Sequence, residues 1–171
     1  MLYSDNISLA DELALKRLAR KKVLLVMGPD CGTSIINGVP LAFANHVARG
    51  GIGIVGASGT GLQEVCCLLD RMGVGISQAY GTGGRDLKDD IGGITALGAL
   101  ERLAVDPDTT GIVLLGKPPG NATRALLLER CQRIGKPVFV HYIGATNYAA
   151  ETAAGFVAAS DLTDLAIKTA Q

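Results

Sequence analysis

The glycine-rich stretch GASGTG, from Gly56 to Gly61, follows a short apolar run and precedes a helical pattern. Four residues separate its outer glycines, which satisfies the first part of the phosphate-binding loop G-x-x-x-x-G-K-[ST]. The next two residues are Leu62 and Gln63, so the lysine that meets the β and γ phosphates and the hydroxyl that binds magnesium are both missing. The sequence therefore argues against a nucleoside triphosphatase.

A second glycine pattern, G-x-G-x-x-G, begins at Gly51, but its glycines lie before and within an apolar run. A dinucleotide fingerprint requires them after the strand. What remains is a turn in which Ser58, Gly59 and Thr60 would present free backbone N–H groups and two hydroxyls at a helix N-terminus, where an anion is favoured. The alternative is that Ser58 or Thr60 only caps the helix. The residues alone leave both readings open.

Elsewhere the chain alternates between short apolar runs and longer helical patterns. The runs predict strands over 23–27, 52–55, 74–80, 111–115 and 137–142, with a further strand and turn over 41–47. The helical patterns predict helices over 8–20, 62–72, 91–103 and 122–134, and a closing helix from Asp161. This alternation indicates one α/β domain with a parallel sheet. Ligands of such sheets gather at the carboxyl ends of the strands, where we expect the loops 56–61, 81–86, 116–121 and 143–147.

The composition argues against several classes of partner. The 16 Lys and Arg residues balance 16 Asp and Glu residues, which gives no attraction to nucleic acid or to an anionic membrane. Three Phe, four Tyr and no Trp supply no set of stacking aromatics for single-stranded nucleic acid. No apolar run approaches the ~18 residues of a membrane span, and the N-terminus has no signal-peptide core. We therefore expect a cytoplasmic protein without a nucleic-acid or membrane partner.

The four cysteines form no C-x-x-C pair, and two are adjacent, which suits neither a zinc site nor a disulfide framework. Reduced thiols and no metal are therefore expected. Cys66 and Cys67 fall within a predicted helix and should be core thiols, whereas Cys31 lies in a loop and is the candidate for a reactive thiol. His141 falls in a predicted buried strand and should be a satisfied core residue, and His46 should face solvent.

Three segments carry a family resemblance: GIGIVGASGTGLQEV, GTGGRDLKDDIGGITALGALERLAVDPDTTGIVLLGKPPG and GKPVFVHYIGAT. In the same order, they resemble the second (ligase) domain of the α subunit of succinyl-CoA synthetase and of related acyl-CoA synthetases. Within that superfamily, MGPDCGTSIINGVPLAFAN and ASGTGLQEV are most similar to the FdrA family. The resemblance implies a flavodoxin-like parallel sheet with helices on both faces. It also implies a single ligase domain over 23–171, preceded by an N-terminal helix within 1–22.

The resemblance further implies a phosphate site. In the synthetases the matching turn, here Ser58, Gly59, Thr60 and Gly61, receives a phosphoryl group carried by a histidine. The segment that would hold this histidine reads NYAAETAAGFVAAS here, and the glutamate that orients it is replaced by Lys117. Lys117 could hold a phosphate or carboxylate directly, or it could be a surface lysine without a role.

Two other loops supply candidate contacts to the ligand. GTGGRD matches the family's loop only in part, because its aspartate is offset. Gly83, Gly84 and Arg85 are candidate contacts there, and Asp86 is expected to stabilise the turn. Asn121 is a further candidate contact, or simply the cap of the helix that follows it.

Length distinguishes this chain from the synthetases. Only about twenty residues precede Val23, where the synthetases carry a whole CoA-binding domain. We therefore expect the CoA-binding domain to be absent and no cofactor site to be evident, with CoA and nucleotide bound by other domains or subunits. The expected partners are a phosphate or acyl-phosphate ligand and either a synthetase β-like subunit, another partner subunit or a second copy of the chain.

Three functions fit these residues. The first is an FdrA-like acyl-CoA ligase domain, incomplete alone, that binds a phosphate or acyl-phosphate group without the phosphohistidine. The second, which the resemblance to the FdrA family implies, is a subunit of an oxamate carbamoyltransferase-type enzyme. Its substrate carbamoyl phosphate needs an acyl-phosphate pocket but neither CoA nor a phosphohistidine. The third is a non-catalytic assembly or regulatory module that keeps the fold.

Overall fold

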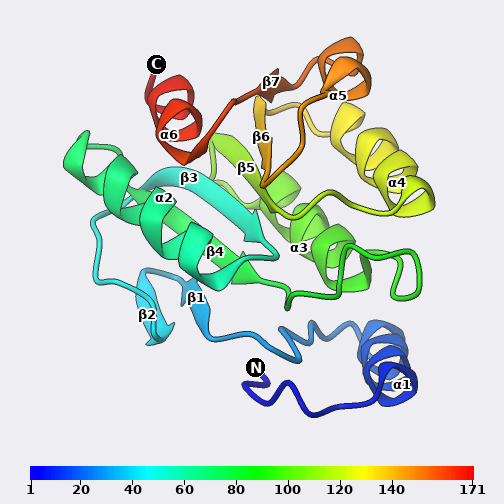
Figure 1. The fold of residues 1–171 in the computed structure, drawn as a ribbon. Coiled ribbons are helices and arrows are strands. Elements are labelled where there is room, and N and C mark those ends of the chain that lie inside the picture. The colour runs from blue at the N-terminus through cyan, green and yellow to red at the C-terminus, as the bar shows by residue number, and fades with distance from the viewer.

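A seven-stranded sheet runs through the middle of the computed structural model, which describes residues 1–171 (Figure 1). The strands lie in the order β2-β1-β4-β3-β5-β6-β7. Their bounds are β1 Thr33–Ile36, β2 Val39–Ala42, β3 Arg49–Gly56, β4 Ile76–Gly81, β5 Gly111–Gly116, β6 Val138–Tyr142 and β7 Val157–Ala158. Strands β3 to β7 pair in parallel, as predicted, whereas β1 pairs antiparallel with both β2 and β4.

Helices cover both faces of this sheet, which confirms the predicted α/β class. The helices are α1 Leu9–Lys21, α2 Gly59–Arg71, α3 Ile94–Val105, α4 Asn121–Gln132, α5 Ala149–Ala153 and α6 Leu162–Ala170. Helices α2 and α6 pack on one face, and α3 and α4 pack on the other (Figure 1). Helix α1 lies outside α3.

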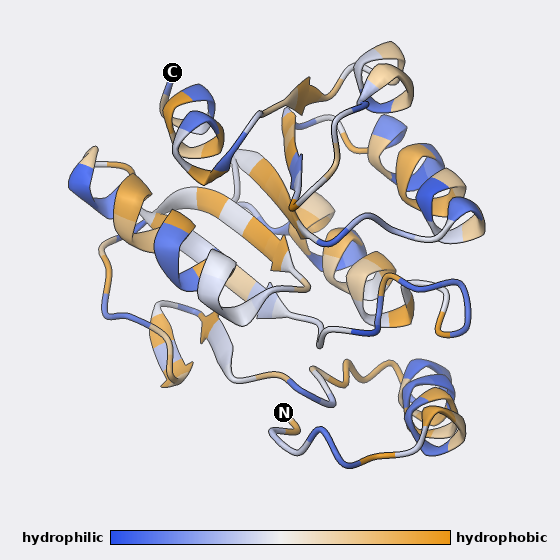
Figure 2. Cartoon of the chain, viewed as in Figure 1, coloured by the Kyte–Doolittle hydropathy of each residue, from blue (hydrophilic) through white to orange (hydrophobic).

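The central strands are buried on both sides, because their side chains alternate between two cores. Ile54 and Val113 pack under α2 and α6, whereas their neighbours Val55 and Leu114 pack under α3 and α4. Figure 2 shows the resulting apolar residues along β3 and β5. This double burial is why these strands could be recognised as continuous apolar runs.

The strand predicted over 23–27 is wrong. The Leu24 amide donates to Ala19 O at the end of α1, and Met27 O accepts from the Leu2 amide, so the segment joins no sheet. Val23 is 82% exposed and Leu24 is 63% exposed. The run is apolar, but it has no neighbouring strand to pair with.

The sequence analysis missed a hairpin at the edge of the sheet formed by β1 and β2. Strands β1 and β2 are joined by Asn37 and Gly38, whose φ angles are 52° and 77°. An Asn-Gly pair with two positive φ angles is typical of the tightest hairpin turns. The strand and turn predicted over 41–47 overlap only the end of β2. The short elements α5 and β7 were also missed.

Candidate functional site

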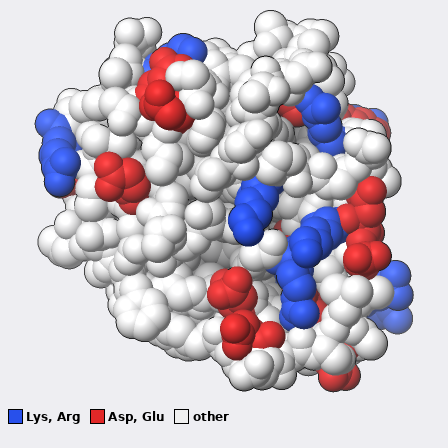
Figure 3. Space-filling model, viewed as in Figure 1, with Lys and Arg blue, Asp and Glu red and all other residues white.

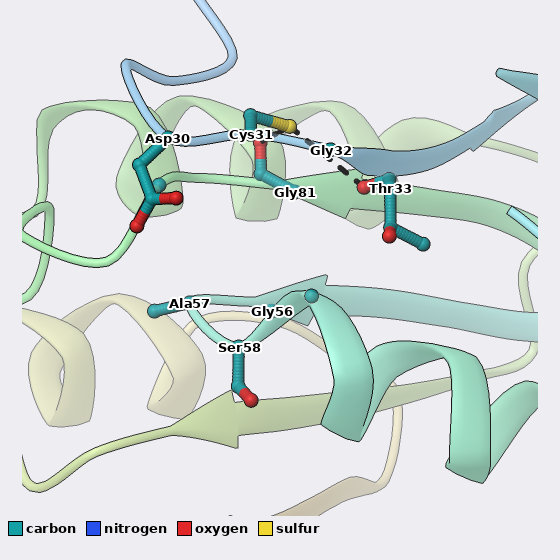
Figure 4. Close-up of a pocket in the computed structure, with 10 residues that line it drawn as sticks. Asp30, Cys31, Gly32, Thr33, Gly56, Ala57, Ser58 and Gly81 are labelled. Atoms are coloured by element: carbon teal, nitrogen blue, oxygen red, sulfur yellow. Dashed lines mark hydrogen bonds between the residues drawn. The ribbon is translucent and has the colours of Figure 1, made fainter. Parts of the chain in front are cut away.

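An open cavity of about 640 Å³ lies where β3 ends and α2 begins. Its walls come from the first turn of α2, from the segment that precedes β1, and from the loops after β4 and β5. A smaller recess at its base, with a volume of about 10 Å³, is lined in part by Gly56 and Gly81 at the ends of their strands (Figure 4). The cavity therefore lies at the carboxyl edge of the sheet, as predicted.

Ser58 caps α2 and leaves the first turn open. Its extended backbone (φ −137°, ψ 110°) places Oγ 3.3 Å from the Gly61 amide, which donates to it. The first intrahelical bond runs from the Leu62 amide to Ser58 O at 2.9 Å, so the amides of Gly59 and Thr60 have no intrahelical partner. Gly59 and Thr60 are exposed. The capping role is present, and the amides remain accessible to an anion.

Glycines keep this junction tight. A Cβ at Gly56 would lie 2.7 Å from Leu62 Cδ1, and a Cβ at Gly61 would lie 3.0 Å from Ser58 Oγ and 3.2 Å from Leu115 Cδ2. Larger residues would therefore push α2 away from β3 and β5. These two glycines therefore allow α2 to pack closely on the sheet.

Lys117 lies on the same cavity, in the loop after β5. Its side chain is exposed, and its ammonium group makes no hydrogen bond or ion pair. Acidic and basic side chains are interspersed over the face shown in Figure 3, so no broad field of one sign covers that face. Lys117 is therefore the basic group that the structure brings to the start of α2, while its role stays a prediction.

Three candidate ligand contacts lie in the loop after β4, and only two of them line the cavity or its recess. Gly84 lines the cavity and Gly83 lines the recess at its base. Arg85 instead turns to the N-terminal segment, where Nε lies 2.9 Å from Glu12 Oε2 and a terminal nitrogen donates to Ile7 O at 2.7 Å. The expectation of Arg85 at the ligand is wrong, because a buried carboxylate on α1 takes its charge.

Asp86 is part of the same buried network. Its carboxylate accepts from the amides of Thr95 and Ala96 at 3.1 and 2.9 Å, and so caps α3. Lys16 of α1 lies 2.6 Å from Asp86 Oδ1 and 2.9 Å from Glu12 Oε1, and all three side chains are buried. Helix α1 thereby fixes the loop that carries Gly83 and Gly84.

Asn121 lies away from the cavity. It is the first residue of α4, and Gly120 occupies the cap position, so the expectation that Asn121 caps the helix is wrong. The acceptor is Asp89, whose Oδ1 takes hydrogen bonds from the amide and the hydroxyl of Thr123, both at 2.9 Å. These bonds lower the pKa of the Asp89 carboxyl.

The thiols and imidazoles take no part in the cavity's open face. Cys31 lines the recess at the base of the cavity (Figure 4), but it is 3% exposed and its Sγ donates to Gly81 O at 3.3 Å, so the loop thiol is not an accessible nucleophile. Burial raises the pKa of Cys66 to about 12 and that of Cys131 likewise to about 12. His141 is buried with Nδ1 3.0 Å from Ala159 O, and His46 is exposed, both as predicted.

The sequence analysis missed two groups on the cavity, Asp30 and Thr33. Asp30 lies in the segment before β1 and Thr33 is the first residue of β1, and both line the cavity and the recess (Figure 4). The available signal was the similarity of MGPDCGTSIING to the FdrA family. Nothing in the spacing of these residues shows that the segment returns to the start of α2.

No cluster of three or more His, Cys, Asp or Glu residues is placed to hold a metal ion. None of the helices has both the length and the apolar character that a membrane crossing requires.

A family profile and a curated relative place the chain among proteins similar to the α subunit of succinate–CoA ligase. The profile of the CoA binding domain family matches residues 48–140. The chain is 55% identical to YahF of Escherichia coli, described as uncharacterized, over 84% of this chain and 28% of that protein. It is 30% identical to the succinate–CoA ligase [ADP-forming] subunit alpha 1 of Archaeoglobus fulgidus, over 84% of this chain and 48% of that subunit.

The fold is shared with a solved ATP citrate lyase of Methanosaeta concilii in complex with (3S)-citryl-CoA. The TM-score is 0.76 at 16% identity, covering 99% of this chain and 33% of that one. The chain thus spans about half the length of the succinate–CoA ligase subunit and less of the other two. The matched family is described by CoA binding, whereas the resemblance assigned 23–171 to the ligase domain. That division, and the expected absence of a CoA site, stay predictions.

Proposed function

Because this chain belongs to the CoA binding domain family, within the succinyl-CoA synthetase α-like acyl-CoA ligases, we propose that it binds a phosphate or acyl-phosphate group at the start of α2. The observation that carries the proposal is the set of first-turn amides open to a cavity that also contains the Lys117 ammonium. Backbone amides at a helix N-terminus and a nearby cation both favour an anion. On this proposal the chain is a member of the FdrA family within that superfamily.

Each residue has a definite task in this proposal. The amides of Gly59 and Thr60 donate to the phosphate oxygens, and Lys117 supplies a positive charge from the opposite loop. Ser58 holds the first turn in shape by accepting from Gly61. CoA and nucleotide bind on other domains or on a synthetase β-like or other partner subunit, and this chain contributes the phosphate-binding half of the reaction site.

The phosphoryl relay through histidine does not run through this chain's own imidazoles. His141 is buried against Ala159 O and His46 is exposed, and neither lines the cavity. This observation also favours the second candidate, a carbamoyltransferase-type subunit, in which carbamoyl phosphate would occupy the same cavity. A non-catalytic assembly module is the remaining alternative.

Isothermal titration calorimetry on the full chain tests the proposal. We expect inorganic phosphate and acetyl phosphate to bind, and Lys117→Ala to raise both Kd values about tenfold, the loss of one charged contact. Lys21→Ala, an exposed lysine on α1, is the matched control and should change neither value. Absence of binding by the wild-type chain would overturn the proposal and leave the assembly module.

A titration with pantetheine addresses the CoA prediction separately. Pantetheine carries the thiol arm of CoA without its phosphates, so it cannot compete for an anion site. We expect no binding to this chain. Saturable binding would show that the predicted absence of a CoA site is wrong, without affecting the phosphate proposal.

A further inference from the structure

Two exposed aromatic side chains, Tyr3 and Phe43, line the cavity at the start of α2. Tyr3 is 55% exposed and Phe43 is 70% exposed, whereas the chain's other five aromatic residues are buried or half-buried. The two rings meet edge to face, with their centroids 6.0 Å apart and their planes at 82°. Because aromatic rings are large apolar surfaces, a group that covers them would gain free energy by removing them from water.

Main-chain hydrogen bonds fix the position of Phe43, which directly follows β2. Its amide donates to Gly32 O at 2.9 Å, and its carbonyl accepts from the side-chain amide of Gln63 on α2. A Cβ at Gly32 would lie 3.0 Å from Phe43 Cδ2, so the glycine makes room for the ring. The ring is therefore held in place before any ligand arrives, which lowers the entropy cost of binding.

The main chain on both sides of Tyr3 is held in a similar way. The Leu2 amide donates to Met27 O at 2.9 Å, and Ser4 O accepts from the Asp30 amide at 3.1 Å. The N-terminal segment thus runs alongside the segment before β1 and brings Tyr3 to the cavity. Two distant parts of the chain are fixed so that their aromatic rings meet there.

The rings and the donors at the start of α2 suit different parts of one ligand. The face of an aromatic ring carries negative partial charge, so the rings do not favour an anion, whereas the first-turn amides and Lys117 do. Gln63, which anchors Phe43, lies four residues after Gly59, about 6 Å along the helix axis. The cavity of about 640 Å³ has the size of a site for a small organic molecule, larger than a phosphate ion alone requires.

We propose that Tyr3 and Phe43 form a subsite for a flat, uncharged apolar group that a short link joins to the phosphate. The group packs against the two rings while the phosphate lies at the first turn of α2. Asp30 lines the same cavity and disfavours a second negative charge on the ligand. This inference rests on the phosphate site of the proposed function and narrows the class of ligand for that site.

Three phosphate monoesters test the subsite by calorimetry on the full chain: methyl, phenyl and cyclohexyl phosphate. We expect phenyl phosphate to bind about tenfold more tightly than methyl phosphate, because roughly 60 Å² of ring surface leaves water. Cyclohexyl phosphate matches phenyl phosphate in size, but its ring is puckered and has no π-system. We expect it to bind about threefold less tightly than phenyl phosphate, because it cannot make aromatic pairs.

Variants of the two rings locate the preference. Phe43→Ala and Tyr3→Ala should each lower the preference for phenyl over methyl phosphate to about threefold, and the double variant should lower it to near one. Both rings are exposed, so each variant should keep the wild-type Kd for methyl phosphate. Val39→Ala, which removes an exposed apolar side chain of β2 outside the cavity, is the matched control and should keep the full preference.

The outcomes distinguish this inference from the proposed function. Equal binding of phenyl and methyl phosphate by the wild-type chain would overturn the aromatic subsite and leave the phosphate site standing. A preference for phenyl phosphate that survives in the double variant would also overturn it, and so would equal binding of phenyl and cyclohexyl phosphate. Failure of all three esters and of inorganic phosphate to bind would remove the phosphate site itself.

Discussion

Helices α2 and α4 begin at the same edge of the sheet, after the adjacent strands β3 and β5, but with different partners. The first turn of α4 holds the Asp89 carboxylate, which accepts from the amide and hydroxyl of Thr123. The first turn of α2 holds only the neutral cap Ser58, and its amides open on the cavity. Both helices have the same first-turn backbone donors. A side chain of the protein accepts from these donors at α4, whereas at α2 they remain available to a ligand.

The surroundings of each helix end fit this difference. A Cβ at Gly120 would lie 2.2 Å from Asp89 Oδ1, so the glycine makes space for an internal carboxylate at α4. At α2 the missing Cβ of Gly59 leaves space in front of Thr33 instead. Asp86 closes α3 in the same way as Asp89 closes α4. The preference for an anion is thus a general property of helix N-termini, and the sequence determines whether a side chain of the protein provides that anion.

The largest effect is a loss of stability, expected at the start of α3, where the capping residue Asp86 is buried beside Lys16. Lys16→Met would leave the buried carboxylates of Asp86 and Glu12 without their shared cation, and we expect the free energy of unfolding to fall by about 3–5 kcal/mol. Urea denaturation measures this change. Lys21→Met, on the exposed side of α1, should change stability little. A loss for Lys16→Met as small as that of the control would show that the network is not needed.

A carboxylate introduced at the start of α2 should occupy its free amides, as Asp89 does at α4. Gly59→Asp places a negative charge at the first-turn amides, and we expect phosphate affinity to fall by about 100-fold from repulsion and competition. Gly59→Ala adds the Cβ without the charge and is the matched control. Thermal unfolding should show that the aspartate variant is at least as stable as the alanine variant, because an acid in the first turn suits a helix. Equal phosphate binding by the two variants would contradict the comparison.

Removing the carboxylate that caps α4 should have a smaller effect, and its effect on stability should depend on pH. Asp89→Ala removes the acceptor for the Thr123 amide, and we expect a lower Tm at pH 7, with Asp90→Ala as the neighbouring control. Hydrogen bonds from Thr123 hold the pKa of Asp89 below its ordinary value of 3.8, so its contribution is present above that value and lost as the pH falls through the lowered pKa. The difference in Tm between wild type and variant should narrow over that range. A difference in Tm that stays constant down to low pH would contradict the assignment of the ionised Asp89 carboxylate as the cap of α4.

The sequence could predict the junction at Ser58 because its signals are local. An apolar run, small residues and a helical pattern follow one another within a few positions, and the structure has β3, the cap and α2 in that order. The hairpin at Asn37 and Gly38 was equally local, and its turn signal was overlooked rather than absent. The closing cap at Asp161 was also recognised from its neighbours, and it accepts from the Asp164 amide.

Contacts between distant segments could not be predicted in the same way. Arg85 faces Glu12 of α1, and Thr33 faces the start of α2, although nothing in either local pattern indicates the partner. Asp89, rather than the adjacent Asn121, caps α4 because the loop after β4 passes over that helix end. The first turn of α2 and Lys117 were therefore predictable from the sequence, whereas the positions of Asp30 and Thr33 on the cavity required the fold.

Titration of ¹⁵N-labelled protein with inorganic phosphate, followed by amide NMR, tests the central claim most directly. The account predicts saturable shifts of the Gly59 and Thr60 amides, with the amide of Thr123 unmoved because Asp89 already holds it. Unchanged resonances at Gly59 and Thr60 up to saturating phosphate, or equal shifts at both helix ends, would contradict it.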